Sequence, residues 1–253
     1  MKKLVFLPIL FLGFTLVAAA QSRDPSPAKS TIKEIKINSA NQFIRLYFGY
    51  AASVTLGDYA ETDFSNIESG FAENGRRLRF GLHFNLKIKN FLTFEYNSFS
   101  HPIDAVSLFN GSGISSQQYN VDDYSIGIVA FGYKYVSFIS KDVDFYINPF
   151  IGIGTMQVGR YSFTVPVQGG TATILQEAER SVESFVYGFN GGVEFWLTDV
   201  LNLSLNLGLI TSEFEINSKI TEQINGVIVS TQVFSYNQPF SALNAGVSIG
   251  YNF

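Results

Sequence analysis

The chain ends with the stretch FSALNAGVSIGYNF, residues 240–253, and the pattern of this stretch decides the fold. From position 245 every odd residue is apolar, whereas every even residue from 244 to 252 is Asn, Gly or Ser. Successive side chains of a β-strand point to opposite faces, so one face of this strand is apolar and the other is small or polar. This length and pattern are typical of a strand that crosses a membrane. The alternative is a half-buried strand that ends a soluble β-sandwich.

The first forty residues are expected to lie outside the folded domain. Lys2 and Lys3 precede an almost wholly apolar run over residues 4–17, and three alanines follow at 18–20. This order is typical of a secretory signal peptide, which we place at residues 1–20 and which is too short to anchor the mature chain as a transmembrane helix. Residues 21–40 are rich in Ser, Pro, Lys and Asp and are predicted to form a flexible periplasmic segment. The folded domain is therefore expected over residues 41–253.

The composition favours a wall that faces lipid. The chain has 25 Phe and 13 Tyr, but only 15% of its residues are charged. A soluble domain would have difficulty covering so many rings, whereas a barrel in a membrane places them in hydrocarbon and in interfacial girdles. The net charge of −4 argues against a nucleic-acid partner. Because the chain has no cysteine, it carries neither disulfides nor a lipidated N-terminal cysteine.

Seven further segments show the same period of two. They are residues 43–52, 77–88, 91–97, 124–138, 143–157, 184–197 and 201–211. The clearest is 77–88, in which Leu, Phe and Ile at even positions alternate with mostly polar residues at odd positions. In 124–138 both faces become apolar near Val129 and Phe131, which indicates a bulge or a tightly packed patch of lumen. Pro149 cannot donate a ladder hydrogen bond, so we expect a bulge or a locally unpaired position there.

The connections between these eight segments alternate strictly in length. The short ones are 89–90, 140–142 and 198–200. The long ones are 53–76, 98–123, 158–183 and 212–239. Outer-membrane barrels have an even number of strands, short periplasmic turns and long extracellular loops, so this order places both termini in the periplasm. We therefore predict an all-β fold, an eight-stranded antiparallel up-and-down transmembrane β-barrel, with a protruding hairpin at the Asn225-Gly226 turn.

The alternation along each segment places a set of charged side chains on the inward face of this barrel. They are Arg45, Arg77, Arg79, His83, Lys87, Glu95 and Glu194. An eight-stranded barrel is only wide enough for side chains to fill, so these residues are expected to pair and to hold the wall together. A narrow ion path is the functional alternative. In the cross-strand register Glu95 is expected opposite His83 or Asn85, and Glu194 opposite Ser204.

One group in the second long loop could carry catalysis. His101 lies close in sequence to Ser100 and Asp104, and such residues support acyl transfer when the nucleophile and the base are within hydrogen-bond reach. No catalytic motif accompanies them, so the prediction is that the protein is not an enzyme. A lipid-modifying activity is kept as an alternative.

The first long loop is acidic, with no Lys or Arg between positions 53 and 75. Its carboxylates are Asp58, Glu61, Asp63, Glu68 and Glu73. They could bridge to lipopolysaccharide phosphates through divalent cations, but their spacing lacks the calcium-loop pattern. We therefore expect a solvated acidic loop and predict no metal site and no cofactor.

The alternating strands and the Tyr251-Asn252-Phe253 end resemble small outer-membrane barrels of the OmpX, OmpW and OmpA-membrane-domain kind, the outer membrane protein beta-barrel domain family. The resemblance implies a place in the bacterial outer membrane, with lipopolysaccharide and the barrel-assembly machinery as partners. It also makes Ile249, Tyr251 and Phe253 a C-terminal assembly signal. The implied role is to stabilise the envelope or to present the long loops to an extracellular or periplasmic protein partner. The alternatives are a channel or carrier for ions or small hydrophobic molecules, and a lipid A-modifying enzyme.

Overall fold

The computed structural model describes residues 44–253, apart from residues 64, 67–68, 88, 112–117, 169 and 178. The expected signal peptide and the expected periplasmic segment, residues 1–20 and 21–40, lie outside this described part. Eight long strands dominate the fold. They are β1 (Ile44–Thr55), β2 (Gly75–Lys87), β3 (Asn90–His101), β5 (Tyr124–Phe138), β6 (Val143–Val158), β10 (Ser184–Trp196), β11 (Leu201–Ile224) and β12 (Val227–Asn252).

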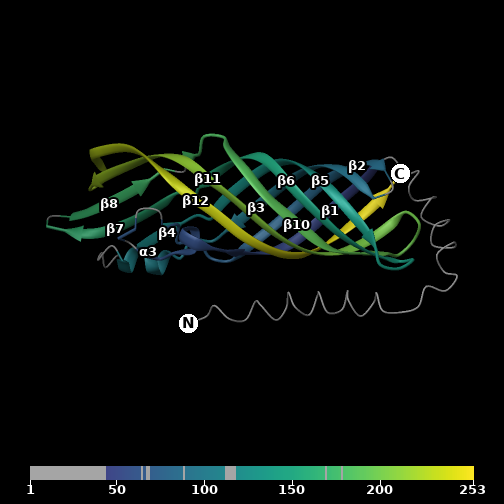
Figure 1. Ribbon diagram of the computed structural model, residues 1–253. Coiled ribbons are helices and arrows are strands. Elements are labelled where there is room, and N and C mark those ends of the chain that lie inside the picture. Colours follow the sequence, from purple (N-terminus) through teal and green to yellow (C-terminus); the bar gives the residue numbers. More distant parts are fainter. Residues whose placement is uncertain are drawn as a thin grey trace.

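These eight strands close into an antiparallel barrel (Figure 1). Each strand pairs with the next of the eight along the chain, and β12 pairs with β1, so the wall forms a complete ring. At the closing seam Phe48 lies opposite Ile249, and the Phe253 N–H donates to the Ile44 carbonyl at 3.0 Å. The predicted eight-stranded up-and-down barrel, closed by the C-terminal strand, is confirmed.

The outward positions of the wall carry large apolar side chains. Phe48, Phe80 and Leu205 are 52%, 50% and 50% exposed, while the residues next to them in each strand point inward and are mostly buried. This follows from the alternation of side chains along a strand. A continuous apolar surface of this size is unfavourable in water, at about 25 cal/mol per Å². In a bilayer it forms the lipid-facing belt of a membrane-spanning barrel.

Two of the strands extend far beyond the belt. β11 and β12 stay paired up to the Asn225-Gly226 turn, where both residues have positive φ, 51° and 81°. The predicted protruding hairpin is confirmed, since these φ values suit the tight turn that matches strand twist. Shorter strands widen the hairpin into a distal sheet with the order β12, β11, β8, β7, β4, at the end opposite the C-terminus (Figure 1). They are β4 (Gln118–Val121), β7 (Tyr161–Val167) and β8 (Gly170–Gln176), while β9 (Glu179–Arg180) pairs with β6.

Two short helices lie in the first and second long loops, η1 (Gly57–Ala60) and α3 (Ala105–Gly111). In the part of the chain that the structure describes, no helix is long and apolar enough to cross a membrane. The helices instead shape the loops, and η1 brings one side chain into the mouth of the barrel, as described below.

The two irregularities expected in β5 and β6 have a simple origin. In β5 the even residues Tyr124, Ile126 and Ile128 are buried in the lumen, and the odd residue Phe131 points outward with 62% exposure. The stretch is apolar on both faces because its inward side chains pack tightly in the lumen while its outward side chains face lipid. The register of β5 shows no bulge. Pro149 pairs with β10 but has no partner in β5, and the β5–β6 register resumes unshifted beyond it. Of the two expectations for Pro149, a bulge or a locally unpaired position, the second is confirmed.

The predicted register between β2 and β3 was wrong. Glu95 lies opposite Gly81, and neither His83 nor Asn85 is its direct partner. The cause is a register shift between Asn85 and Lys87, where β2 has one residue more than β3. This shift displaces every β2–β3 pair farther from the turn. The predicted pairing of Glu194 with Ser204 is confirmed.

Candidate functional site in the barrel lumen

The lumen contains two layers of buried side chains. The charged layer lies toward the short turns and consists of Arg45, Arg77, Arg79, His83, Glu95, Lys134 and Glu194. The apolar plug lies toward the long loops and consists of Tyr59, Phe99, Tyr124, Ile126, Ile128, Met156, Val186, Ile210, Phe214, Ile216 and Phe240. The layers meet where the guanidinium of Arg77 lies over the ring of Phe99, 5.5 Å from its centroid.

Glu194 is the centre of one half of the charged layer. It projects inward from β10 and is fully buried. Nη1 of Arg45 lies 3.0 Å from its Oε2, and the ammonium of Lys134 donates a short hydrogen bond to its Oε1. Arg45 is fixed in turn by a hydrogen bond from its Nε to Oδ1 of Asn252, at 2.6 Å. One carboxylate thus connects β10 with β1 and β5 across the lumen.

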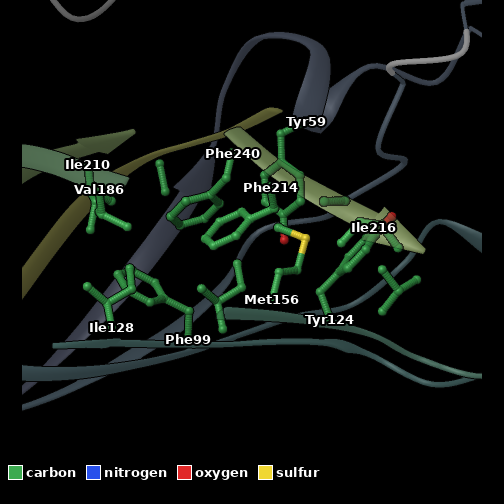
Figure 2. Close-up of a cluster of buried hydrophobic side chains, with 14 of the residues drawn as sticks. Tyr59, Phe99, Tyr124, Ile128, Met156, Val186, Ile210, Phe214, Ile216 and Phe240 are labelled. Atoms are coloured by element: carbon green, nitrogen blue, oxygen red, sulfur yellow. The ribbon is translucent and has the colours of Figure 1, made fainter. Parts of the chain in front are cut away.

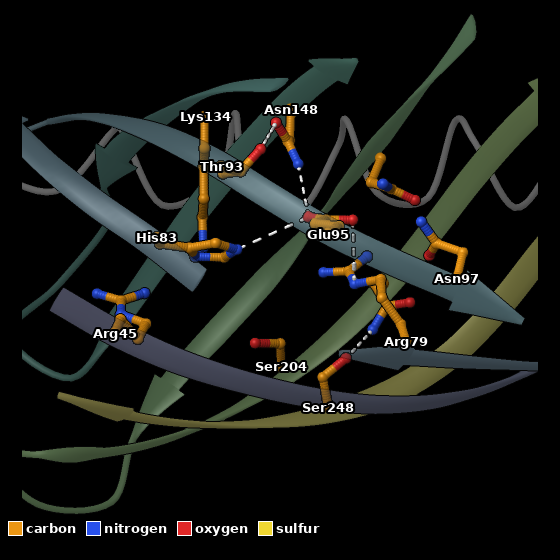
Figure 3. A network of polar contacts seen from close by, with 12 residues as sticks. Arg45, Arg79, His83, Thr93, Glu95, Asn97, Lys134, Asn148, Ser204 and Ser248 are labelled. Atoms are coloured by element: carbon orange, nitrogen blue, oxygen red, sulfur yellow. Dashed lines mark hydrogen bonds and ion pairs between the residues drawn. The ribbon is translucent and has the colours of Figure 1, made fainter. Parts of the chain in front are cut away.

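Glu95, on β3, is the centre of the other half (Figure 3). Its Oε2 lies 3.6 Å from Nε of Arg79, and its Oε1 lies 3.7 Å from Nε2 of His83. Asn148 donates a hydrogen bond to Oε1 at 3.0 Å. The guanidinium of Arg79 also lies 4.2 Å from the centroid of the Tyr47 ring. This second carboxylate therefore connects β3 with β2 and β6.

Arg77 is held by amides. Its Nε and Nη2 donate to Oδ1 of Asn97 at 2.9 and 2.6 Å, and its Nη1 donates to Oδ1 of Asn190 at 3.1 Å. Among the described residues, four buried cationic side chains, Arg77 with Arg45, Arg79 and Lys134, therefore face three buried carboxylates, which are Glu95, Glu194 and Asp144 opposite Glu194 in β6. Because cations are in excess, each carboxylate is essential to the balance of buried charge.

Six of the seven predicted lumen residues are buried inside the barrel. They are Arg45, Arg77, Arg79, His83, Glu95 and Glu194. Lys87 is the last residue of β2, and its side chain lies outside the described residues. The sequence analysis missed Lys134, which belongs to the same network. Its even position in β5, in step with Tyr124 and Ile126, is the signal that would have found it.

The apolar plug fills the upper lumen with rings from several elements (Figure 2). Phe240 of β12 lies 5.4 Å from Phe99 and 6.1 Å from Phe214, measured between ring centroids. Tyr59 of η1 packs edge-on against Phe240 at 5.2 Å and lies 5.4 Å from Tyr124. All five rings are buried, so the plug occludes the lumen below the long loops.

The first long loop folds over the mouth of the barrel and inserts Tyr59. The Ala72 N–H donates to the Tyr59 carbonyl at 3.0 Å, and the Tyr124 hydroxyl donates to the Gly70 carbonyl at 2.8 Å. Gly70 is required at this close approach, because a Cβ there would lie 2.5 Å from the Tyr59 carbonyl oxygen. The solvated acidic loop expected from the sequence is therefore also a cap, and the isolated Tyr59 gave no sign of this role.

The structure does not bring the candidate Ser–His–Asp group together. Ser100 and His101 are neighbours in β3 and point to opposite faces of the wall. Ser100 donates to Asp123 at 3.1 Å, and Asp104 accepts from both N–H and hydroxyl of Ser107. These hydrogen bonds hold the pKa of Asp104 below its usual value.

His101 is instead a buried link between the wall and the cap. Its Nε2 lies 2.9 Å from the Ser53 hydroxyl and its Nδ1 lies 3.1 Å from the Tyr59 hydroxyl. None of these three side chains is accessible to solvent. The outward residues of β3 beyond Tyr96 are serines, so His101 lies above the lipid-facing belt. Burial lowers its pKa from 6.5 to about 4.

Acidification is expected to loosen this cap. Because His101 takes up a proton more readily when the loop is open, its stabilising contribution is complete above pH 6.5 and is lost as the pH falls toward 4. Each pH unit below 6.5 removes about 1.4 kcal/mol of this contribution to the stability of the cap, so the loss at pH 5 is about 2 kcal/mol. Protection of the Ala72 amide against hydrogen exchange should therefore decrease between pH 7 and pH 5. In a His101→Gln variant, which keeps a donor and an acceptor but does not titrate, this decrease should be absent, and equal pH dependence in both proteins would contradict the assignment.

The carboxylates of the first loop are engaged locally. Asn66 donates to Glu61 at 2.7 Å, and Ser65 donates to Asp63 through its hydroxyl and its N–H. The hydrogen bonds from Ser65 lower the pKa of Asp63. Glu68 lies outside the described residues. Within the described ranges, no three His, Cys, Asp or Glu side chains are placed to hold a metal ion.

The three residues of the expected assembly signal lie on the outer wall at the C-terminal end of β12. Ile249, Tyr251 and Phe253 all point outward and are exposed. The rings of Tyr251 and Phe253 meet edge to face at 4.9 Å between centroids. They form the last rows of the belt near the short turns, where aromatic girdles are found in such barrels.

Comparison with known proteins gives a likeness of shape without close sequence relatives. No family model and no curated protein matches the chain. Neisserial surface protein A is similar at 10% identity, with a TM-score of 0.49 over 83% of this chain and 97% of that chain. A major outer membrane protein from Thermus thermophilus gives 11% identity and a TM-score of 0.47 over 83% and 99% of the two chains. The attachment invasion locus protein Ail of Yersinia pestis gives 13% identity and a TM-score of 0.39 over 84% and 99%.

The closed wall and its apolar outer face identify the class of protein. The eight strands form a closed ring, so the backbone groups of the wall are paired within the sheet, as a span through hydrocarbon requires. The outward face is apolar and the inward face is packed with polar and aromatic side chains. Closed antiparallel barrels with such a belt, short turns at one end and long loops at the other are found in the bacterial outer membrane. This chain is a small outer-membrane β-barrel protein.

Proposed function

We propose that the protein is a non-enzymatic surface barrel that presents its distal sheet, on the extracellular side, to a protein partner. The observation that supports this role most directly is the outer edge of β12. β1 pairs with β12 only as far as Thr55 opposite Ala242, and the next N–H, of Leu56, donates to the Ser241 carbonyl at 2.9 Å. Beyond Ser241, none of the described strands pairs with this edge.

The free edge offers a regular row of backbone groups. In an antiparallel strand the N–H and the C=O of one residue point to the same side, and the side alternates along the strand. Since Ser241 points toward β1, the odd residues Thr231, Val233 and Ser235 point their backbone groups to the free edge. Pro239 is also odd, and it stands at a position where no N–H is needed for the ladder.

The side chains of this edge are unusual for an exposed strand. Between the register shift at Val229 and Pro239, residues 230–236, STQVFSY, contain no charge, no proline and no bulge, and Val233 is 73% exposed. Exposed edges are ordinarily protected by charges, prolines or bulges, because an unprotected edge adds further strands. Such an edge binds an extended segment by β-strand addition, in which main-chain hydrogen bonds supply affinity. The expected partner segment is therefore extended and uncharged.

The two alternative functions find less support. The apolar plug closes the upper lumen with buried rings, which argues against a continuous ion path. The opposite orientations of Ser100 and His101, and the burial of the Ser53, His101 and Tyr59 group, argue against a lipid-modifying site. Surface presentation needs neither a path nor a catalytic group.

The edge can be tested with a ten-residue peptide of alternating Val and Thr. On binding, hydrogen exchange should slow at the amides of Thr231, Val233 and Ser235, which point outward, and change little at the even residues between them. Val233→Lys should weaken binding about tenfold or more, because a charge at the edge disfavours several backbone hydrogen bonds of about 0.5–1.5 kcal/mol each. Val167→Lys, in β7 of the same sheet, is the matched control and should bind normally. Protection without this alternation, or equal loss in both variants, would count against the edge as the binding site.

A further inference from the structure

The outer wall of the barrel has a recess of about 480 Å³ at the upper border of the belt. It lies across β3, β5 and β6. Its lining includes Tyr96, Ser98, Gly127, Thr155 and Glu183. At this position the large apolar side chains of the belt give way to small residues on three neighbouring strands.

The strand register explains how the recess forms. In the belt, outward-facing Tyr96, Val129 and Ile153 lie side by side in one row. In the next row toward the loops, Ser98 pairs with Gly127, and Gly127 pairs with Thr155. Three small residues therefore follow three large ones on neighbouring strands, and the wall becomes thinner by the depth of a side chain.

Gly127 forms the floor of the recess. A Cβ at this position would lie 3.4 Å from the hydroxyl of Tyr96, so the Tyr96 ring reaches from its own row toward the glycine. One side of the recess is therefore an aromatic surface that ends in a hydroxyl. This arrangement offers both an apolar face and a hydrogen-bonding group to the same ligand.

The lining is rich in neutral hydrogen-bonding groups. Ser98, Ser125, Thr155 and Tyr96 contribute hydroxyls, and the amide of Gln157 lies among them. The lining includes the carboxylate of Glu183 and, among the described residues, neither Lys nor Arg. A site for a phosphate group would be expected to offer cations. The chemistry suits a ligand with many hydroxyls and no negative charge at this point.

We propose that this recess binds the sugar head group of a glycolipid in the outer leaflet. The floor of the recess continues directly into the lipid-facing belt, so an acyl chain attached to the bound sugar would run down over Val129 and Ile153. The sugar hydroxyls would meet Ser98, Ser125 and Thr155, and its apolar face would lie against Tyr96. The position at the border of hydrocarbon and water is the depth at which a lipid head group sits.

Native mass spectrometry of protein reconstituted in vesicles tests this inference. The vesicles contain phosphatidylethanolamine with equal amounts of monoglucosyl diacylglycerol and phosphatidylglycerol. The wild type should retain the glucosyl lipid in preference to the phosphatidylglycerol. Gly127→Leu fills the floor and should reduce this preference about tenfold, because the bound sugar would lose one or two of its hydrogen bonds to the lining.

Two further variants make the result decisive. Ser98→Leu fills the recess from β3 without changing the glycine, so it serves if Gly127→Leu does not assemble. Ala245→Leu places the same side chain at an outward position of β12, on the opposite side of the ring from β5, and should retain the glucosyl lipid as the wild type does. No preference for the glucosyl lipid in the wild type, or an unchanged preference in both filled variants, would overturn the proposal.

Discussion

A Glu194→Gln variant is expected to lose about 3–5 kcal/mol of stability, the usual cost of removing one partner of a buried ion pair. The substitution keeps the size of the side chain and removes its charge. Arg45 and Lys134 would then remain buried without the carboxylate that both contact. The charged layer already holds more cations than carboxylates, and the neighbouring Asp144, opposite Glu194 in the β6–β10 register, already accepts a hydrogen bond from Trp196.

The single tryptophan is well placed to report this loss. Trp196 donates from its indole nitrogen to Asp144 at 2.7 Å, and the guanidinium of Arg45 lies 5.0 Å from its ring. Urea unfolding in lipid vesicles, followed by tryptophan fluorescence, should show a lower midpoint for Glu194→Gln. Glu215→Gln, at an exposed position of β11 beyond the belt, is the control and should change stability by no more than about 0.5 kcal/mol.

A second substitution separates charge balance from packing. Adding Lys134→Met to Glu194→Gln removes one of the two stranded cations and should recover part of the lost stability. If the carboxylate contributed only through its volume, the added substitution would give no recovery. Equal stability of Glu194→Gln and the wild type would refute the structural role of the charged layer.

The wall of the barrel could be predicted from the sequence because it depends on local properties. Alternation assigns each residue to lipid or lumen, and turn length assigns each connection to one end. This is why Arg45, Glu95 and Glu194 could be placed inside before any partner was known. The pairing of Glu194 with Ser204 also followed, because a short turn fixes the register between β10 and β11.

The contents of the lumen could not be predicted in the same way. Glu95 was assigned to the wrong cross-strand partners because a shift near Asn85 changes the register without leaving a signal in the alternation. Lys134 was overlooked because β5 is apolar on both faces where it passes the plug. The insertion of Tyr59 depends on the close approach of the backbone at Gly70, which belongs to the tertiary structure of the loop. Of these three features, the insertion of Tyr59 depends on contacts between residues far apart in the chain, such as that between Gly70 and Tyr124.

Deleting Phe253 is expected to reduce assembly into the membrane far more than it reduces synthesis. The resemblance to outer-membrane barrels motivates this prediction, since their terminal aromatic residue serves as an assembly signal. In the folded barrel Phe253 makes a modest contribution, consisting of one backbone hydrogen bond to Ile44 and one ring contact with Tyr251. A single hydrogen bond is worth only about 1 kcal/mol net, so the finished barrel should tolerate its loss.

Assembly and stability can therefore be separated by experiment. Folded barrel in the outer membrane is measured by its altered gel mobility without boiling, and synthesis by total protein. Phe253→Ala removes the ring but keeps the residue, and it is expected to lower assembly as the deletion does. Phe189→Ala removes an outward ring of similar exposure from β10 and is the matched control. If outward rings mattered only through the lipid contacts of the finished barrel, both variants would reach the membrane equally. A selective loss for Phe253→Ala, together with near-normal stability of the protein that does assemble, would show that the ring at the end of β12 acts before the barrel closes.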